Sequence, residues 1–174
     1  PRRGFDQFIS SESVNRAKGK VIHQSAYINS VKIVGVDIAR KDDDQFVIIK
    51  RQGLAVFQPE KYRNQTTQTM AGRIAAVIRE WDPDMVFIDM GNIGAAVYDI
   101  LAEWNFSERV TGVWFGSEAD RKDKYANKRA EMWGNTRDLL DNGMCLPDDT
   151  ELCDDLTGPE YGSTLKDQIL LESK

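Results

Sequence analysis

Apolar residues in the first half of the chain fall in short continuous runs, which indicate strands buried on both faces, and then at helical spacing. Three short runs rich in β-branched residues, at 31–38, 45–51 and 54–58, are separated only by turns. Connections this short predict three antiparallel neighbouring strands. Apolar residues at helical spacing then predict an amphipathic helix over 66–81, which the Asp82-Pro83 pair ends.

Residues 85–115 alternate between predicted strand and helix. Met85 to Asp89 forms a strand-like run, a helix follows it, and a further strand is predicted at 110–115. Right-handed crossovers would set these last two strands parallel to the first, on the side away from the hairpin. The fold class is therefore α/β, with a mixed sheet of antiparallel strands 1–3 and parallel strands 4–5, flanked by helices.

The flanks are less strongly patterned. Residues 1–30 are polar and resemble a linker or leading arm, with a short capped helix at 10–19. A third long helix is predicted over 125–140, and a final strand over 168–171. With 174 residues, of which 41% are hydrophobic, we expect one compact unit with a sizeable core.

Two aspartates end two of the predicted strands. Asp37 closes the first and Asp89 closes the fourth. In open α/β sheets the carboxyl edge of the strands holds the ligand crevice, and the predicted strand order places both residues there. Two adjacent carboxylates repel unless a cation bridges them, and oxygen ligands suit Mg²⁺ or Mn²⁺. Each aspartate alone could instead start a turn or cap a helix. Asp44, which leads into the second strand, is a further candidate ligand.

Basic residues gather around the start of the third predicted helix. Lys124 and Lys128 share one helical face in projection, which indicates either a solvated surface or contact with phosphate groups. Arg129 projects into the apolar arc, so it either extends its head group to solvent or pairs with a buried carboxylate.

Composition excludes several classes of function. His23 is the only histidine, so a histidine-based catalytic pair and a zinc site built with the two cysteines are excluded. No phosphate-binding loop of the G-x-x-x-x-G-K-[ST] type occurs, which excludes a P-loop ATPase. A net charge of −5 argues against a dedicated basic nucleic-acid binder, but not against a metal-dependent nuclease. We expect a soluble, intracellular protein with reduced thiols.

Four ordered motifs resemble the nuclease domain of tailed-bacteriophage terminase large subunits. They are Val34-Gly-Val-Asp-Ile-Ala-Arg40 with Asp43-Asp44, Val86-Phe-Ile-Asp-Met-Gly91 with Ile93-Gly94-Ala95, Tyr125-Ala-Asn-Lys-Arg-Ala-Glu-Met-Trp133, and Leu156-Thr-Gly-Pro-Glu-Tyr161. The similarity covers nearly the whole chain. Residues 1–30 resemble the segment that joins the ATPase domain of that family to its nuclease, and residues 31–174 resemble the nuclease domain itself.

The resemblance implies an RNase H-like fold and a metal-dependent endonuclease that cuts concatemeric double-stranded DNA during genome packaging. It makes Asp37 and Asp89 the first two metal ligands of a two-cation site. It places a third acidic ligand beyond residue 174, so the domain is expected to be truncated and weakly active. It also implies DNA, the ATPase domain of the same polypeptide, the portal protein and the terminase small subunit as partners, at the procapsid portal in the host cytoplasm.

Two alternatives remain open. The chain could be a docking or DNA-binding module of the packaging motor without catalytic activity. It could also be a fragment of an RNase H-like ATPase or sugar kinase, although Ala39-Arg-Lys-Asp42 stands where such proteins need a glycine-rich phosphate turn.

Overall fold

The structure is a computed structural model, and it describes residues 6–38, 45–91 and 93–172. The contacts divide the chain into two compact units where the sequence predicts one: unit 1 holds residues 6–22 and 115–172, and unit 2 holds residues 23–114. Chain length limits the number of units but cannot show that the two ends of a chain pack together. In the described part of the chain, no helix combines the length and apolar character that crossing a bilayer requires.

Unit 2 is built on a mixed sheet. Its strands are β2 (Lys32–Ile38), β3 (Gln45–Gln52), β4 (Ala55–Val56), β5 (Glu60–Arg63), β6 (Met85–Asp89) and β7 (Val110–Val113). Their order is β4-β3-β2-β6-β7, with β5 also paired to β3. β2 is antiparallel to β3 and parallel to β6, which confirms the predicted position of the first strand. The predicted strand at 54–58 is shorter, and β5 was not predicted because three of its four residues are charged.

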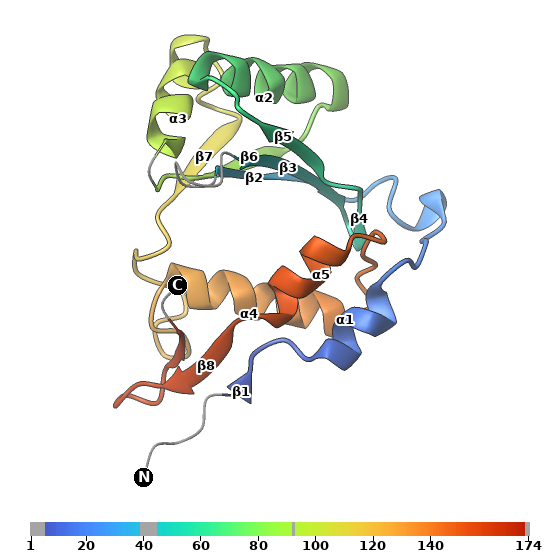
Figure 1. The fold of residues 1–174 in the computed structure, drawn as a ribbon, viewed down its shortest axis with the longest axis vertical. Coiled ribbons are helices and arrows are strands. Elements are labelled where there is room, and N and C mark those ends of the chain that lie inside the picture. Colours follow the sequence, from blue (N-terminus) through green and yellow to red (C-terminus); the bar gives the residue numbers. More distant parts are fainter. Residues whose placement is uncertain (1–5, 39–44, 92, 173–174) are drawn as a thin grey trace. The chain divides into compact units, whose positions relative to one another are not determined.

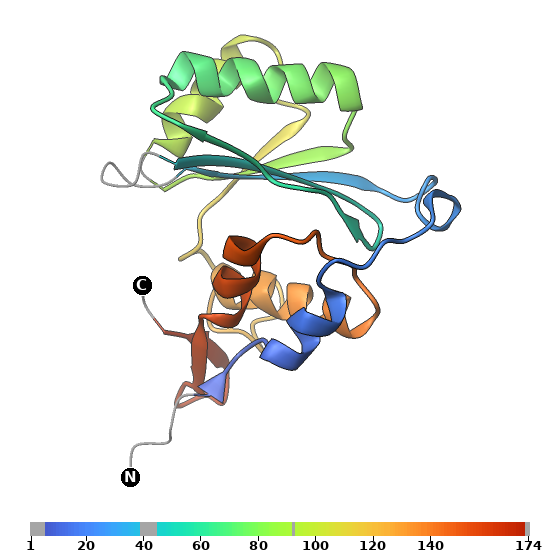
Figure 2. The ribbon, with the colours of Figure 1, turned by 45° about the vertical axis from the view of Figure 1, so that its right-hand side comes forward.

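Two helices, α2 (Thr67–Trp81) and α3 (Gly94–Glu103), cover one face of this sheet (Figures 1 and 2). Even-numbered residues of the central strands, such as Val34, Val36 and Ile88, are buried against them. Side chains alternate between the two faces of a strand, so Asp37 and Asp89 point to the face opposite these helices. The sequence pattern indicated burial on both faces, but the burial of β2 and β6 alternates.

Unit 1 contains α1 (Ser11–Ala17), α4 (Lys128–Asp141) and α5 (Thr150–Thr157), with a small antiparallel sheet of β1 (Asp6–Gln7), β8 (Glu160–Ser163) and β9 (Ile169–Leu171). The leading segment is part of this unit, since Phe8, Ile9 and Val14 are buried and β1 pairs with β8. The domain boundary at residue 30 stays a prediction. The short helix η1 (Gln24–Ala26) belongs to unit 2.

The third long helix begins later than its pattern predicts. Asn127 has extended backbone angles, φ −156° and ψ 175°, and its side chain accepts the N–H of Ala130 as the N-cap. Lys124 therefore lies before α4, and the prediction that it shares a helical face with Lys128 is wrong. Trp104 and Trp114 are exposed.

Candidate metal site

The two strand-ending aspartates lie at the same level of the sheet. The parallel register pairs Val36 of β2 with Ile88 of β6, and Asp37 and Asp89 are the next residue on each strand. Neighbouring strands are about 4.8 Å apart, and residues at the same register position of parallel strands point to the same face. The two carboxylates are therefore adjacent at the carboxyl edge of the sheet, as the sequence predicts.

Exposure differs between the two aspartates. Asp37 is exposed and Asp89 is half-buried at the end of β6. Asp89 remains in the sheet, because it pairs with Val113 of β7 and the N–H of Met90 then donates to the carbonyl oxygen of Val113 at 2.9 Å. The backbone that carries Asp89 is thus fixed on both sides, and both carboxylates stay accessible.

The turn after β6 orients the Asp89 carboxylate. The N–H of Gly91 donates to Oδ1 of Asp89 at 3.0 Å. Further along the turn, Gly94 opens α3 so close to β6 that a Cβ at Gly94 would lie 1.8 Å from the carbonyl oxygen of Asp89. Gly91 and Gly94 belong to one of the four sequence motifs, but their contacts to Asp89 depend on three-dimensional packing that spacing alone does not show.

The donor set suits a hard divalent cation. Carboxylate oxygens are the ligands that Mg²⁺ and Mn²⁺ prefer, and Asp37 and Asp89 supply them from rigid strands. Among the described residues, no group of three or more His, Cys, Asp or Glu side chains forms a larger metal cluster. The third candidate ligand, Asp44, lies outside the described residues, as do Asp42 and Asp43.

The candidate DNA-contacting residues belong to unit 1. Lys128 Nζ lies 2.8 Å from both Asp120 Oδ1 and Glu131 Oε2. Lys124 Nζ lies 5.2 Å from the centroid of the Tyr125 ring. Arg129 Nη1 donates to the backbone carbonyl of Glu172. Whether these three side chains contact phosphates stays a prediction.

Glu131 is a buried carboxylate that the sequence did not single out. It is 4% exposed, and it accepts the N–H groups of Asp120 at 2.9 Å and Arg121 at 3.0 Å as well as Lys128 Nζ. Burial opposes ionisation of Glu131, but the Lys128 and backbone hydrogen bonds outweigh it and lower its pKa to about 2. The hydrogen bonds to Asp120 and then to Glu131 raise the pKa of Lys128.

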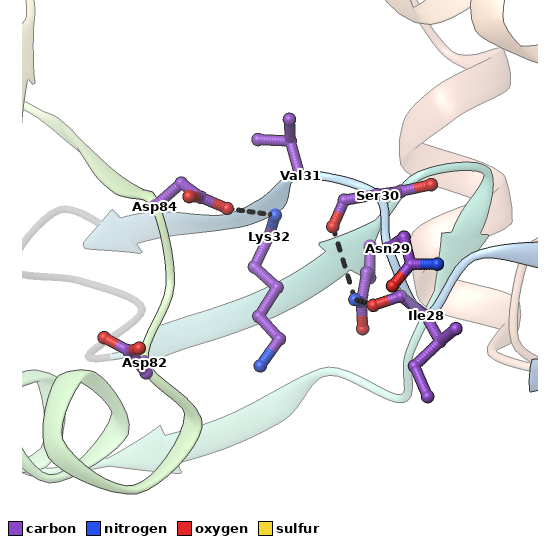
Figure 3. A pocket seen from close by; sticks show the side chains of 8 residues that line it. Ile28, Asn29, Ser30, Val31, Lys32, Asp82 and Asp84 are labelled. Carbon is purple, nitrogen blue, oxygen red and sulfur yellow. Dashed lines mark hydrogen bonds between the residues drawn. The ribbon is translucent and has the colours of Figure 1, made fainter.

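A separate pocket of about 310 Å³ lies at the opposite end of β2, at the amino edge of the parallel strands (Figure 3). Its polar groups are engaged with each other: the N–H of Lys32 donates to Asp84 Oδ2 at 2.8 Å, and Gln52 Nε2 donates to the carbonyl oxygen of Ile28 at 3.0 Å. Asp82 pairs with Arg109 Nη2 at 2.6 Å. This pocket is therefore distinct from the site of Asp37 and Asp89, and its carboxylates are already paired within the protein.

No protein-family model and no curated protein sequence matches the chain. Solved structures do. The nuclease domain of the large terminase subunit gp2 of bacterial virus Sf6 superposes with a TM-score of 0.75 at 15% identity, over 97% of this chain and 89% of that one. The large terminase nuclease from thermophilic phage G20c gives 0.66 at 13% identity, over 97% and 89%.

The nuclease domain of the large terminase of Thermus phage P74-26 gives a TM-score of 0.61 at 15% identity, over 95% of this chain and 85% of that one. A mutant form of the Sf6 domain has been solved with manganese and with calcium, and the G20c nuclease with magnesium and with cobalt. The predicted resemblance is confirmed at the level of the fold: this chain has the RNase H-like fold of the nuclease domains of phage large terminase subunits.

Proposed function

We propose that this chain is a divalent-metal-dependent DNA endonuclease domain of a viral DNA-packaging terminase. The observation that carries the proposal is the register of β2 and β6, which brings Asp37 and Asp89 together on one face of the sheet in a terminase nuclease fold. The substrate would be double-stranded concatemeric DNA, and the reaction would be hydrolysis of a backbone phosphodiester bond.

Asp37 and Asp89 would hold the cations, in a site for two Mg²⁺ or Mn²⁺ ions. Divalent cations bound there would activate water as the nucleophile and neutralise charge on the phosphate. The residues of the chain itself hold the two carboxylates in place. β2 and β6 hold the carboxylates at one level, and the Gly91 N–H fixes one oxygen of Asp89. Preorganised ligands of this kind lose little conformational freedom when a cation binds.

The duplex would be held by basic side chains that take no part in bond cleavage. The candidates remain Lys124, Lys128 and Arg129. Among the described residues, Lys128 Nζ contacts two carboxylates, whereas Lys124 Nζ lies over the Tyr125 ring. We further propose that the partners are the ATPase domain of the same polypeptide, the portal protein and the small subunit, at the procapsid portal in the host cytoplasm.

Cleavage of supercoiled plasmid in Mn²⁺ tests the proposal. The parent chain should nick the plasmid slowly, chelation with EDTA should stop it, and Asp37→Asn and Asp89→Asn should each remove the Mn²⁺-dependent activity while the protein stays folded. Asp99→Asn is the matched control, because Asp99 is an exposed aspartate on α3 of the same unit. Equal cleavage by the parent and both site variants would refute the assignment.

The same preparation separates the alternatives. If the chain is a docking or DNA-binding module, substitution of either aspartate should leave its affinity for DNA unchanged. An RNase H-like ATPase or sugar kinase would bind ATP and hydrolyse it, which nucleotide titration of the purified chain measures directly.

A further inference from the structure

Gly91 makes two different contributions next to the Asp89 carboxylate. Its N–H donates to Asp89 Oδ1 at 3.0 Å, so one carboxylate oxygen is held by the turn that follows β6. A hydrogen bond of this kind restricts rotation of the carboxylate.

The space where a side chain at position 91 would begin lies beside the same carboxylate. A Cβ built at this position would lie 3.3 Å from Asp89 Oδ1, 3.6 Å from Oδ2 and 3.7 Å from Cγ. These are the three nearest atoms, and all three belong to Asp89. A methyl group there would therefore stand beside both oxygens that a cation would approach.

Neither a positive φ nor a close backbone atom accounts for the glycine. Gly91 is not among the residues with positive φ, a conformation that Gly19, Gly53 and Gly143 adopt, so alanine fits its backbone. Gly94 provides the contrast, because a Cβ there would meet the carbonyl oxygen of Asp89 at 1.8 Å, which is a backbone clash. At Gly91 the three nearest atoms to the added methyl would all belong to the Asp89 carboxylate.

We propose that Gly91 is a positioning residue for the metal site: its N–H fixes Asp89 Oδ1, and its bare Cα keeps both carboxylate oxygens open to a hydrated divalent cation. Mg²⁺ keeps several of its water ligands when a protein binds it, so space beside the carboxylate is part of the site. This inference rests on the proposed function, because it takes Asp89 as a cation ligand.

Calorimetric titration of the full 174-residue chain with Mn²⁺ tests the inference. Gly91→Ala should weaken Mn²⁺ binding about tenfold or more, the size expected for a change in the shell around the ligands. The thermal midpoint without metal should stay within about 2 °C of the parent, because alanine meets no backbone atom there. Gly72→Ala is the control, since a Cβ at Gly72 in α2 finds nothing within 4 Å, and its Mn²⁺ affinity should equal that of the parent.

The outcomes separate the two proposals. If the parent binds Mn²⁺ and Asp89→Asn abolishes this binding, while Gly91→Ala binds as the parent does, the role of Gly91 is overturned and the metal site stands. If the parent shows no Mn²⁺ binding that depends on Asp89, both proposals fail. Unfolding of Gly91→Ala would also overturn the inference, because it would show that the glycine serves the fold.

Discussion

Replacing Glu131 with glutamine should destabilise unit 1 in a way that depends on pH. The carboxylate accepts hydrogen bonds from the backbone N–H groups of Asp120 and Arg121 and from Lys128 Nζ, all between 2.8 and 3.0 Å. It thereby joins the first turn of α4 to the segment that precedes the helix. Glutamine has similar volume but one acceptor oxygen and no charge, so these donors are paired less completely.

The size of the effect follows from the pKa of Glu131. A decrease from 4.5 to about 2 corresponds to about 3 kcal/mol of preferential interaction with the ionised form. The side chain is only 6% exposed, so solvent screens this interaction little. Because the pKa of the folded state lies below that of the unfolded state, the stabilisation is complete above about pH 4.5 and is lost as the pH falls towards 2.

Chemical denaturation of the parent and Glu131→Gln at pH 7, 4.5, 3 and 2 measures this difference. The gap in free energy of unfolding should be about 3 kcal/mol at pH 7 and should decrease steadily below pH 4.5. Glu118→Gln is the control: Glu118 pairs with Lys122 at 2.7 Å on the surface, where such a pair contributes about 0 to 1 kcal/mol.

Two results would refute this reasoning. A gap below about 0.5 kcal/mol at pH 7 would mean that the hydrogen bonds to Glu131 do not outweigh the cost of its burial. A large gap that stays constant down to pH 2 would mean that glutamine disturbs packing and that ionisation of Glu131 is not the cause.

Three further predictions concern the sheet edge and the basic residues. Without metal, Asp37→Asn and Asp89→Asn should leave the thermal midpoint unchanged or raise it, because each removes repulsion between adjacent carboxylates; a decrease of several degrees in a thermal melt would contradict this. Gly94→Ala should cost about 3 kcal/mol in chemical denaturation, since its Cβ would meet the carbonyl oxygen of Asp89; unchanged stability would show that α3 can shift freely. Substituting Lys124 and Lys128 together with alanine should lower the salt slope of log K for duplex DNA by about 0.9 for each lysine that binds a phosphate, with Mn²⁺ affinity unchanged; a slope equal to that of the parent would show that neither lysine binds one.

The sheet was predictable because its signals are local. The segments between β2, β3 and β4 are too short for crossovers, and a helix before and after β6 allows parallel pairing with its neighbours. Those two facts place Asp37 beside Asp89 without any knowledge of side-chain contacts, and the register agrees. β5 was missed because its charged and aromatic residues resemble a loop more than a strand.

The remaining features depend on contacts between distant parts of the chain. β1 forms only by pairing with β8, near the other end of the chain, so neither strand carries a pattern of its own. Glu131 is one acid among basic residues in the sequence, and only folding shows that backbone N–H groups of the preceding segment surround it. The contribution of Gly91 likewise depends on how the turn after β6 folds back onto Asp89.

The most direct test of the proposed metal site is a crystal of this chain soaked in Mn²⁺ and measured for anomalous scattering. If Asp37 and Asp89 hold the cations, an anomalous peak should lie within ligand distance of carboxylate oxygens of both residues, and it should disappear in Asp89→Asn crystals soaked in the same way. Anomalous density that avoids both aspartates, at a Mn²⁺ concentration where calorimetry shows binding, would contradict the assignment.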